Sequence, residues 1–382
     1  MRLFKGKKLA FAILILATVC LYACSDKGRE NPDKTDAKTT DRQAVLVNLA
    51  DNIVIPAYGK FKLKFDVMVS KSDAFSTNPT PTALVEFRTA WVDAYTEWQK
   101  VELFDFGPGQ VQAIRSYFNV YPASESGIAA NIAAGSTANL DVPAAYPTQG
   151  FPALDYLING LATTDQAVVS FYTTAPNAAN RIAYLKRITA KMNTVFTTVN
   201  TDWSTYRNQF VNMTGITASS STSLVANSYV LNFERYIRSG KFGIPSGAML
   251  NGVVSPTKVE AFYKKDISLS LAKTAVQASI DFFNGKSVTS GIEGPSFKTY
   301  LDGLGAKDSG TGNLLTQIVN AQFLLINQKL GLLSENLANE VNTNNQAMVN
   351  VNTDMQKAVR LLKVDMTSAM SITVSYTDND GD

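Results

Sequence analysis

Helical spacing of apolar residues dominates this chain. Between residues 182 and 210, apolar side chains recur at steps of three and four, which is the spacing of one buried helix face. The stretches 84–98, 314–337 and 348–370 show the same period, and only the segment 372–376 alternates like a β-strand. The pattern predicts an all-α fold of helical bundles with one short strand near the C-terminus.

A loop of residues that disfavour helix divides the pattern near the middle of the chain. This loop, residues 215–223, predicts a linker between a helical bundle at 43–214 and a second bundle at 224–377. Residues 156–161 and 300–304 share a weak Tyr-Leu and Gly-Leu similarity, which favours two packed, pseudo-duplicated up-down bundles.

The N-terminus has the features of a signal peptide at residues 1–23. Four basic residues precede an apolar run at 9–21, which is shorter than the roughly 20 residues of a spanning helix. The run ends in Leu-Tyr-Ala-Cys, which resembles a lipoprotein signal-peptidase site and predicts lipidation of Cys24. An ordinary secretory signal with a chance cysteine is the alternative.

Polar residues fill the segment 24–42 that follows. Beyond the cysteine it has almost no apolar side chain to bury, so it is predicted to be a flexible tether. Ser25 directly after the lipidated cysteine fits sorting to an outer membrane. The expected location is therefore the cell envelope, lipid-anchored at the outer membrane, facing either the periplasm or the surface.

Composition excludes several chemistries. The chain of 382 residues contains no histidine, so it cannot form a Ser-His-Asp triad, a Cys-His pair or a histidine zinc site by itself. The leader carries four of the positive charges, so its removal changes the formal net charge from +3 to 3 minus 4, or −1. This charge gives no support to nucleic-acid binding.

The segment 150–160 reads Gly-Phe-Pro-Ala-Leu-Asp-Tyr-Leu-Ile-Asn-Gly and resembles the signature of the imelysin family, also called peptidase family M75. That signature is Gly-x-His-x-x-Glu followed by Tyr-Leu-Leu and a glycine. In this chain Pro152 replaces the histidine and Asp155 replaces the glutamate. The matching positions are Gly150, Tyr156, Leu157 and Gly160.

Further segments resemble the family in the same order along the chain. They are residues 49–58, 90–91, 98–102, 106–108, 234–238 and 243–247. The resemblance implies two packed four-helix bundles with the signature in the groove between them. It also implies an association with iron acquisition and carries the label of a metal-dependent peptidase.

Asp155 has two interpretations. It is either a groove carboxylate that binds a cation or polar ligand, or a helix-cap or core-edge aspartate that is hydrogen-bonded to backbone. Pro152 offers no side-chain donor or acceptor, and it is expected in the first turn of a helix, where a missing N–H costs nothing.

Other candidate binding residues are Glu102, Tyr156, Arg235 and Arg238. If they reach the groove, they form one polar cluster with Asp155 that can hold iron or another divalent cation through carboxylates, with Asp155 as the metal candidate. Buried ion pairing between the bundles is the alternative. No cofactor is assigned with certainty.

Two remaining features receive structural interpretations. The tryptophans at positions 91, 98 and 203 fall at helical spacing and are expected in the core. Residues 378–382 resemble the start of a calcium loop, but the chain stops before the closing glutamate, so they are interpreted as a solvated acidic tail.

Three hypotheses for the function follow. The first is a non-catalytic, lipid-anchored binding protein that uses the groove between the bundles, in iron uptake or metal handling, with the membrane and an envelope or iron-uptake protein as partners. The second is a metal-dependent peptidase of the imelysin type. The third is a surface adhesion or structural module.

Overall fold

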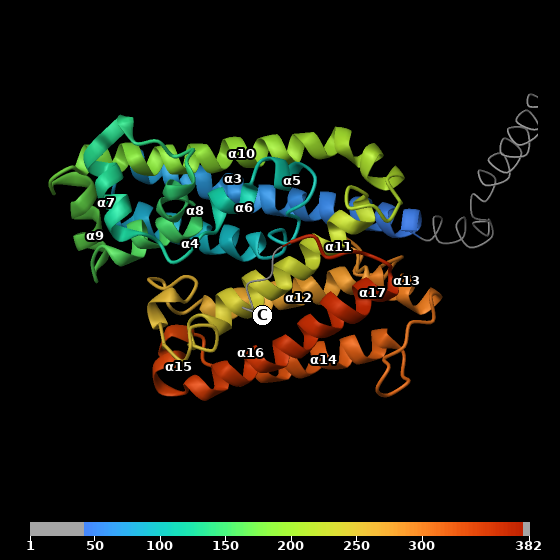
Figure 1. Ribbon diagram of the computed structural model, residues 1–382. Coiled ribbons are helices and arrows are strands. Elements are labelled where there is room, and N and C mark those ends of the chain that lie inside the picture. The colour runs from blue at the N-terminus through green and yellow to red at the C-terminus, as the bar shows by residue number, and fades with distance from the viewer. Residues whose placement is uncertain (1–41, 377–382) are drawn as a thin grey trace, which may run out of the picture. The chain divides into compact units, whose positions relative to one another are not determined.

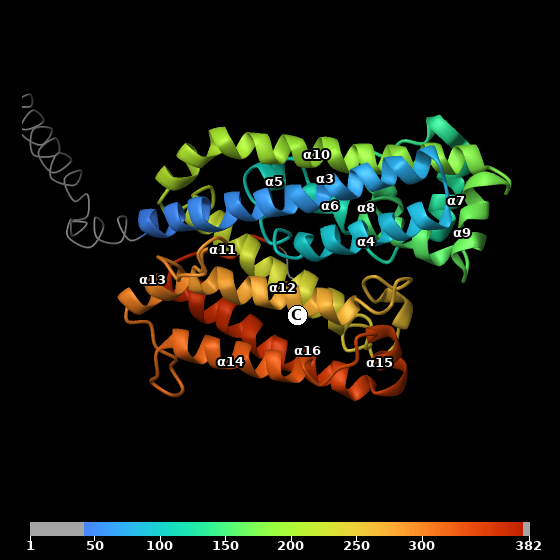
Figure 2. The same cartoon turned by 180° about the vertical axis from the view of Figure 1, so that it is seen from behind.

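The computed structural model describes residues 42–376. The predicted signal peptide, Cys24, nearly all of the predicted tether and the acidic tail lie outside these residues. The described residues belong to one compact unit. They fold into helices arranged in two layers (Figure 1), and the reverse view in Figure 2 shows the same two layers.

The N-terminal layer is built on the long helices α3 (Ile55–Thr77), α4 (Pro81–Trp98) and α10 (Ala178–Asn212). Its shorter helical segments are η1 (Leu49–Val54), α5 (Pro108–Val111), α6 (Ile114–Phe118), α7 (Glu125–Ala134), η2 (Gly135–Thr137), η3 (Pro143–Thr148), α8 (Gly150–Asp155), η4 (Tyr156–Gly160) and α9 (Asp165–Thr173). Of these, η1 and η4 are π-helical, and η2 and η3 are 3₁₀-helical.

The C-terminal layer is built on α12 (Ser268–Asn284), α14 (Leu315–Leu330) and α16 (Asn345–Arg360). Its other segments are α11 (Ser221–Leu231), η5 (Asn232–Gly243), η6 (Pro256–Lys258), α13 (Phe297–Gly303), α15 (Leu337–Thr343), η7 (Leu361–Met366) and α17 (Thr367–Ala369). Here η5 and η7 are π-helical and η6 is a 3₁₀ turn.

The predicted all-α fold is confirmed, and the apolar periodicity explains it. The run 182–210 lies within α10, whose buried face includes Leu185, Ile188, Met192 and Phe196 at steps of three and four. The three tryptophans are buried, as predicted. In the N-terminal core, the rings of Phe61 and Phe196 meet edge to face with centroids 4.8 Å apart.

The connection between the layers runs from the end of α10 at Asn212 to the start of α11 at Ser221. The side chain of Ser220 caps α11 by accepting a hydrogen bond from the N–H of Ser223 at 3.4 Å. The predicted linker 215–223 therefore includes the first turn of α11. The division into two separate domains stays a prediction.

The predicted strand at residues 372–376 is wrong, because these residues form no regular secondary structure. Their backbone bonds instead to the side chain of Asn227 on α11. The amide nitrogen of Asn227 donates to the carbonyl of Thr373 at 3.1 Å, and its oxygen accepts from the N–H of Ser375 at 2.7 Å. The alternation arises because Ile372 is buried while its neighbours are exposed.

Contacts across the two layers combine aromatic and polar groups. The rings of Phe104 and Phe282 have centroids 5.9 Å apart, and the hydroxyl of Ser228 donates to the carbonyl of Leu103 at 2.9 Å. Within residues 42–376, no helix is both long enough and apolar enough to cross a membrane.

Candidate functional site between the layers

The signature segment forms α8 and the π-helical η4, which follow one another directly. Gly150 opens α8 with φ of +77°, and a Cβ at this position would lie 2.4 Å from the carbonyl oxygen of Phe118. Only glycine fits this close approach. Pro152 is the third residue of α8, where its missing N–H leaves no intrahelical bond unmade, as the sequence led us to expect.

The carboxylate of Asp155 is enclosed by hydrogen-bond donors. Asp155 is 1% exposed, and its Oδ1 accepts from the side chain of Asn159 at 2.9 Å and from the backbone N–H of Lys264 at 3.0 Å. Its Oδ2 accepts from the backbone N–H of Tyr263 at 2.9 Å. These contacts connect the end of α8 to the segment after η6, which is the arrangement of a core-edge aspartate.

Burial raises the pKa of Asp155 to about 7, although the hydrogen bonds from Tyr263, Asn159 and Lys264 act in the opposite direction. A cavity of about 20 Å³ adjoins Asp155 and Pro152, which is room for about one water molecule. A cation at these carboxylate oxygens would meet the positive ends of N–H dipoles that already point at them.

Tyr156 and Gly160 accommodate the same segment of the C-terminal layer. The ring of Tyr156 packs against that of Tyr263 with centroids 5.2 Å apart. A Cβ on Gly160 would lie 2.6 Å from the ring of Tyr263, so the glycine makes room for this ring. The hydroxyl of Tyr263 donates to Glu125 on α7. The signature thus positions a docking surface for the segment around Tyr263.

Glu102, the second predicted carboxylate, lies in a different buried group. It is 3% exposed, and its Oε1 lies 3.3 Å from Nε of Arg115 and accepts from the amide of Asn119 at 2.9 Å. The guanidinium of Arg115 also stacks on the ring of Tyr236 at 3.2 Å, which is a cation–π contact.

The amide of Asn119 joins Glu102 to a further buried carboxylate, Glu260, to which it donates at 2.8 Å. Glu260 forms an ion pair with Lys241, and each side chain is 2% exposed. Gln99 donates to Glu260 at 3.0 Å and accepts from Lys241 at 2.7 Å.

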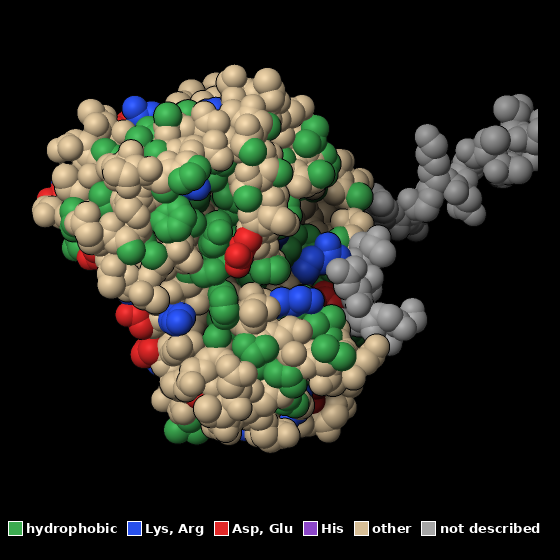
Figure 3. Space-filling model, turned by 90° about the vertical axis from the view of Figure 1, so that its left-hand side faces the viewer, with side chains coloured by type: hydrophobic (Ala, Val, Ile, Leu, Met, Phe, Trp, Pro, Cys, Tyr) green, Lys and Arg blue, Asp and Glu red, His purple; other side chains and the backbone are tan. Residues whose placement is uncertain are grey.

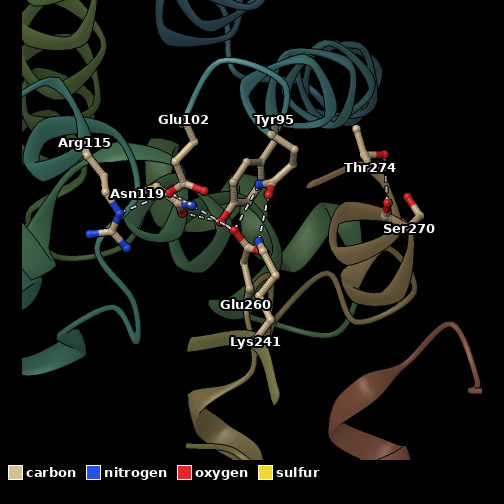
Figure 4. Close-up of polar contacts among 9 residues, drawn as sticks. Tyr95, Glu102, Arg115, Asn119, Lys241, Glu260, Ser270 and Thr274 are labelled. Atoms are coloured by element: carbon tan, nitrogen blue, oxygen red, sulfur yellow. Dashed lines mark hydrogen bonds and ion pairs between the residues drawn. The ribbon is translucent and has the colours of Figure 1, made fainter. Parts of the chain in front are cut away.

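We call this group the Glu260 network. It comprises Tyr95, Gln99, Glu102, Arg115, Asn119, Lys241 and Glu260. The hydroxyl of Tyr95 completes it, 3.0 Å from Glu260 Oε1 and 2.6 Å from the side-chain oxygen of Asn119. Figure 4 shows these side chains converging from both layers.

The pKa values of the two carboxylates of the network shift in opposite directions. Burial raises the pKa of Glu102, while the Coulombic attraction of Arg115 and Lys241 opposes the rise. Burial acts on Glu260 too, but the charge and hydrogen bonds of Lys241 outweigh it and hold the pKa of Glu260 below its usual value. Glu260 is therefore the ionised partner of Lys241.

The two predicted arginines lie on η5. Arg238 is 3% exposed, with a nitrogen 3.8 Å from the sulfur of Met249, and Arg235 is partly buried. The structure thus gives Asp155 and Glu102 separate partners. Both groups contact the segment after η6. In this segment Glu260 accepts from Asn119, which also bonds to Glu102, and the backbone N–H of Tyr263 donates to Asp155.

Comparison with known proteins identifies the family of this chain. The family model of imelysin, peptidase M75, matches residues 54–365. The chain belongs to the imelysin family. No curated protein sequence matches it.

Two solved structures share the imelysin fold. An imelysin-like protein from Psychrobacter arcticum 273-4 is 17% identical, with a TM-score of 0.65 over 88% of this chain and 98% of that one. A candidate iron-regulated protein A precursor from Parabacteroides distasonis ATCC 8503 is 15% identical, with a TM-score of 0.67 over 86% of this chain and 95% of that one. At these identities the likeness establishes the fold alone.

This imelysin-family chain has a larger cavity between its layers, of about 650 Å³, which we call the inter-layer cavity. Its walls come from η1, the start of α3, the end of α4 with the turn after it, α12, the loop that follows α12, and Asn327 on α14. Thr274, Gln277, Ala278 and Asp281 line it at helical spacing, so they form one face of α12. The volume is typical of small-molecule sites.

At the end of the molecule where Figure 1 places α7, α9 and α15, hydrophobic side chains gather along the border between the layers. Single acidic side chains and a few basic ones lie among them (Figure 3). Among residues 42–376, no group of three or more Asp, Glu, Cys or His side chains is arranged to hold a metal ion.

Sequence analysis missed Glu260, Lys241 and Asn119. Glu260 lies in an irregular segment with no helical spacing, and its partner Asn119 is 141 residues away, so no local pattern connects them. Lys241 gave no separate signal, because η5 also carries Glu234, Arg235 and Arg238, and the sequence does not show which of these charges is paired with Glu260.

Proposed function

We propose that this imelysin-family chain is a non-catalytic, envelope-anchored binding protein whose ligand site is the inter-layer cavity. The observation that carries the proposal is the cavity itself, with its volume of about 650 Å³ and its apolar floor. Ligand sites of proteins are concave, mostly apolar and of about 300–1,000 Å³. The predicted anchor at Cys24 would hold this cavity next to a membrane.

A peptidase of the imelysin type is less well supported. Both oxygens of Asp155 already accept hydrogen bonds, and the adjoining cavity of about 20 Å³ has no room for a peptide. Pro152 supplies no ligand, and the chain contains no histidine to activate a water. The carboxylates of the Glu260 network are paired with Arg115 and Lys241.

A role in iron handling draws support from the structural neighbour described as iron-regulated. Because Asp155 is surrounded by N–H donors, we assign this role to a bound ligand or to a partner of the anchored protein. Direct coordination of an iron ion by Asp155 is the alternative that the experiment below tests.

Binding is tested with the chain from Ser25 onward, which retains the whole compact unit. Nile red, an uncharged dye that fluoresces in apolar surroundings, should bind saturably at one site. Ala278→Trp places a large side chain in the cavity and should abolish this signal, whereas Ala183→Trp on the exposed face of α10 should leave it unchanged. If Ala278→Trp still binds Nile red as the parent protein does, the dye binds elsewhere and the proposal is overturned.

The same protein tests the two alternatives, which are iron coordination by Asp155 and peptidase activity. The thermal unfolding temperature is measured with ferric, ferrous, zinc and calcium ions for the parent protein and for Asp155→Asn. We expect no metal ion to raise this temperature in the parent protein alone. Incubation with an unfolded protein substrate should produce no fragments. Fragment formation that is lost on substituting Asp155 or Glu102 would establish the peptidase instead.

A further inference from the structure

We propose that the inter-layer cavity binds an amphiphile with one anionic headgroup, its tail on the cavity floor and its headgroup at a rim of lysines. This inference rests on the proposed function and names the chemical class of its ligand. It follows from the separation of apolar and basic side chains around the cavity.

The floor of the cavity is apolar and formed by both layers. Ile53, Ala57, Leu103 and Phe104 of the N-terminal layer and Phe282 of the C-terminal layer line it, and each is at most 5% exposed. Because the ring of Phe282 contacts that of Phe104, the floor is closed between the layers. An apolar tail gains free energy for every methylene that it buries on such a floor.

The rim of the cavity is basic. Four lysines line it (Lys60, Lys100, Lys273 and Lys286), against two acidic residues, Glu97 and Asp281. The rim therefore carries a local excess of positive charge, although the chain without its leader has a formal net charge of −1. A basic cluster beside an apolar wall concentrates anions.

Three lysines of the rim keep hydrogen-bonding capacity for a headgroup, whereas Lys100 is paired with Glu97 at 2.6 Å. Nζ of Lys60 donates to the carbonyl of Val288 at 2.7 Å and has no acidic partner within 4.0 Å among the described residues. Lys273 and Lys286 form only long ion pairs, 3.9 Å to Glu335 and 3.5 Å to Asp281. Each ammonium group has three hydrogens, so several remain to bind anionic oxygens.

The chemistry selects a carboxylate or a phosphate as the headgroup. Both offer only acceptor oxygens to the lysine donors, whereas a quaternary ammonium would be repelled and a hydroxyl would gain one weak hydrogen bond. A carboxylate would come from a fatty acid and a phosphate from a phospholipid fragment. The headgroup that binds more tightly distinguishes these two sources.

The test is displacement of Nile red from the chain that begins at Ser25. Four decyl amphiphiles with the same tail are compared: the carboxylate, the phosphate, the alcohol and the trimethylammonium salt. One of the two anions should displace the dye at least about tenfold more tightly than the alcohol, with the ammonium weakest. The preference should weaken as ionic strength rises, because the rim is exposed to solvent.

Lysine variants separate the headgroup from the tail. Lys60→Gln combined with Lys273→Gln should reduce the anion preference to within about threefold while Nile red still binds. Lys273→Gln alone should give an intermediate preference and serves if the double variant unfolds. Lys186→Gln, an exposed lysine on α10 outside the cavity, should keep the full preference.

The outcomes distinguish this inference from the proposed function. If Nile red binds in the cavity but all four amphiphiles compete equally, the headgroup assignment is overturned and the binding site stands. If the anion preference survives in the double variant, the rim is not the headgroup site. If Ala278→Trp leaves dye binding intact, both proposals fail together.

Discussion

At the scale of single residues, the signature position Asp155 acts as an acceptor for the backbone of the other layer. Its three donors come from Asn159, Tyr263 and Lys264, and two of them are backbone N–H groups. Such a carboxylate contributes to stability through the hydrogen bonds that it accepts. The same burial that encloses it raises its pKa to about 7.

Asp155→Asn tests this role. The amide offers one acceptor oxygen where the carboxylate offers two, so one N–H of the opposite segment loses its partner. We expect the free energy of unfolding to fall by about 1–3 kcal/mol. Asp73→Asn, on the exposed surface of α3, should change it by less than about 0.5 kcal/mol. Urea unfolding followed by circular dichroism measures both values.

The difference in stability between the parent protein and Asp155→Asn should depend on pH with a definite sign. The pKa of Asp155 is raised to about 7 in the folded state from about 3.9 in the unfolded state, so the folded state binds more protons between these values. The stability of the parent protein relative to Asp155→Asn should therefore fall by about 2 kcal/mol as the pH rises from about 5 to about 7. A difference that grows with pH would show that the donors keep Asp155 ionised.

At the scale of elements, the sequence predicted what local spacing controls. The helices α4 and α10 follow from apolar residues three and four apart, because one face of each packs into the core. Residues 372–376 also alternate, but a strand needs a partner, and here the side chain of Asn227 supplies the backbone bonds. The alternation of residues 372–376 therefore indicates that one side of the segment is buried, and it does not indicate a β-strand.

The sequence pointed to one part of the candidate site, because that part lies within a short segment of the chain. Pro152 and Asp155 stand out against the family pattern, and both border one small cavity. Glu260 could not be found in this way, because its donors Asn119 and Gln99 lie 141 and 161 residues away in the other layer. Long-range polar pairing leaves no period in the sequence.

The contact between η5 and the segment after η6 depends on the buried pair Lys241 and Glu260. Lys241→Met leaves a buried carboxylate without its cation, so we expect a loss of about 3–5 kcal/mol in the free energy of unfolding. Adding Glu260→Gln removes the unpaired charge and should recover more than about 1 kcal/mol of that loss. The double-mutant cycle measures the coupling between the two residues.

An exposed ion pair provides the matched control for this cycle. Lys62 and Asp66 on α3 are 2.5 Å apart with side chains 47% and 48% exposed. Lys62→Met should change the free energy of unfolding by less than about 1 kcal/mol. A similar small loss for Lys241→Met would mean that water reaches Glu260 and that this pair does not hold η5 to the segment after η6.

At the scale of the whole molecule, the layers share buried groups that neither can satisfy alone. Glu260 of the C-terminal layer takes its donors Gln99 and Asn119 from the N-terminal layer. Phe104 and Phe282 cover each other across the same border. Separating the layers would expose these rings and remove the donors Gln99 and Asn119, which leaves Lys241 as the remaining donor to Glu260, and this favours unfolding as one cooperative unit.

The positions of the tryptophans make this cooperativity measurable. Trp91, Trp98 and Trp203 all lie in the N-terminal layer, whereas Phe323 is buried in the C-terminal layer against Phe233 and Phe283. Phe323→Ala should destabilise its own layer by about 3–5 kcal/mol. If the layers unfold together, the transition followed by tryptophan fluorescence shifts by the same amount as the transition followed by circular dichroism. A fluorescence transition that does not move would show two independent domains, as the sequence division at 215–223 allows, and the inter-layer cavity would then lie between separable bodies.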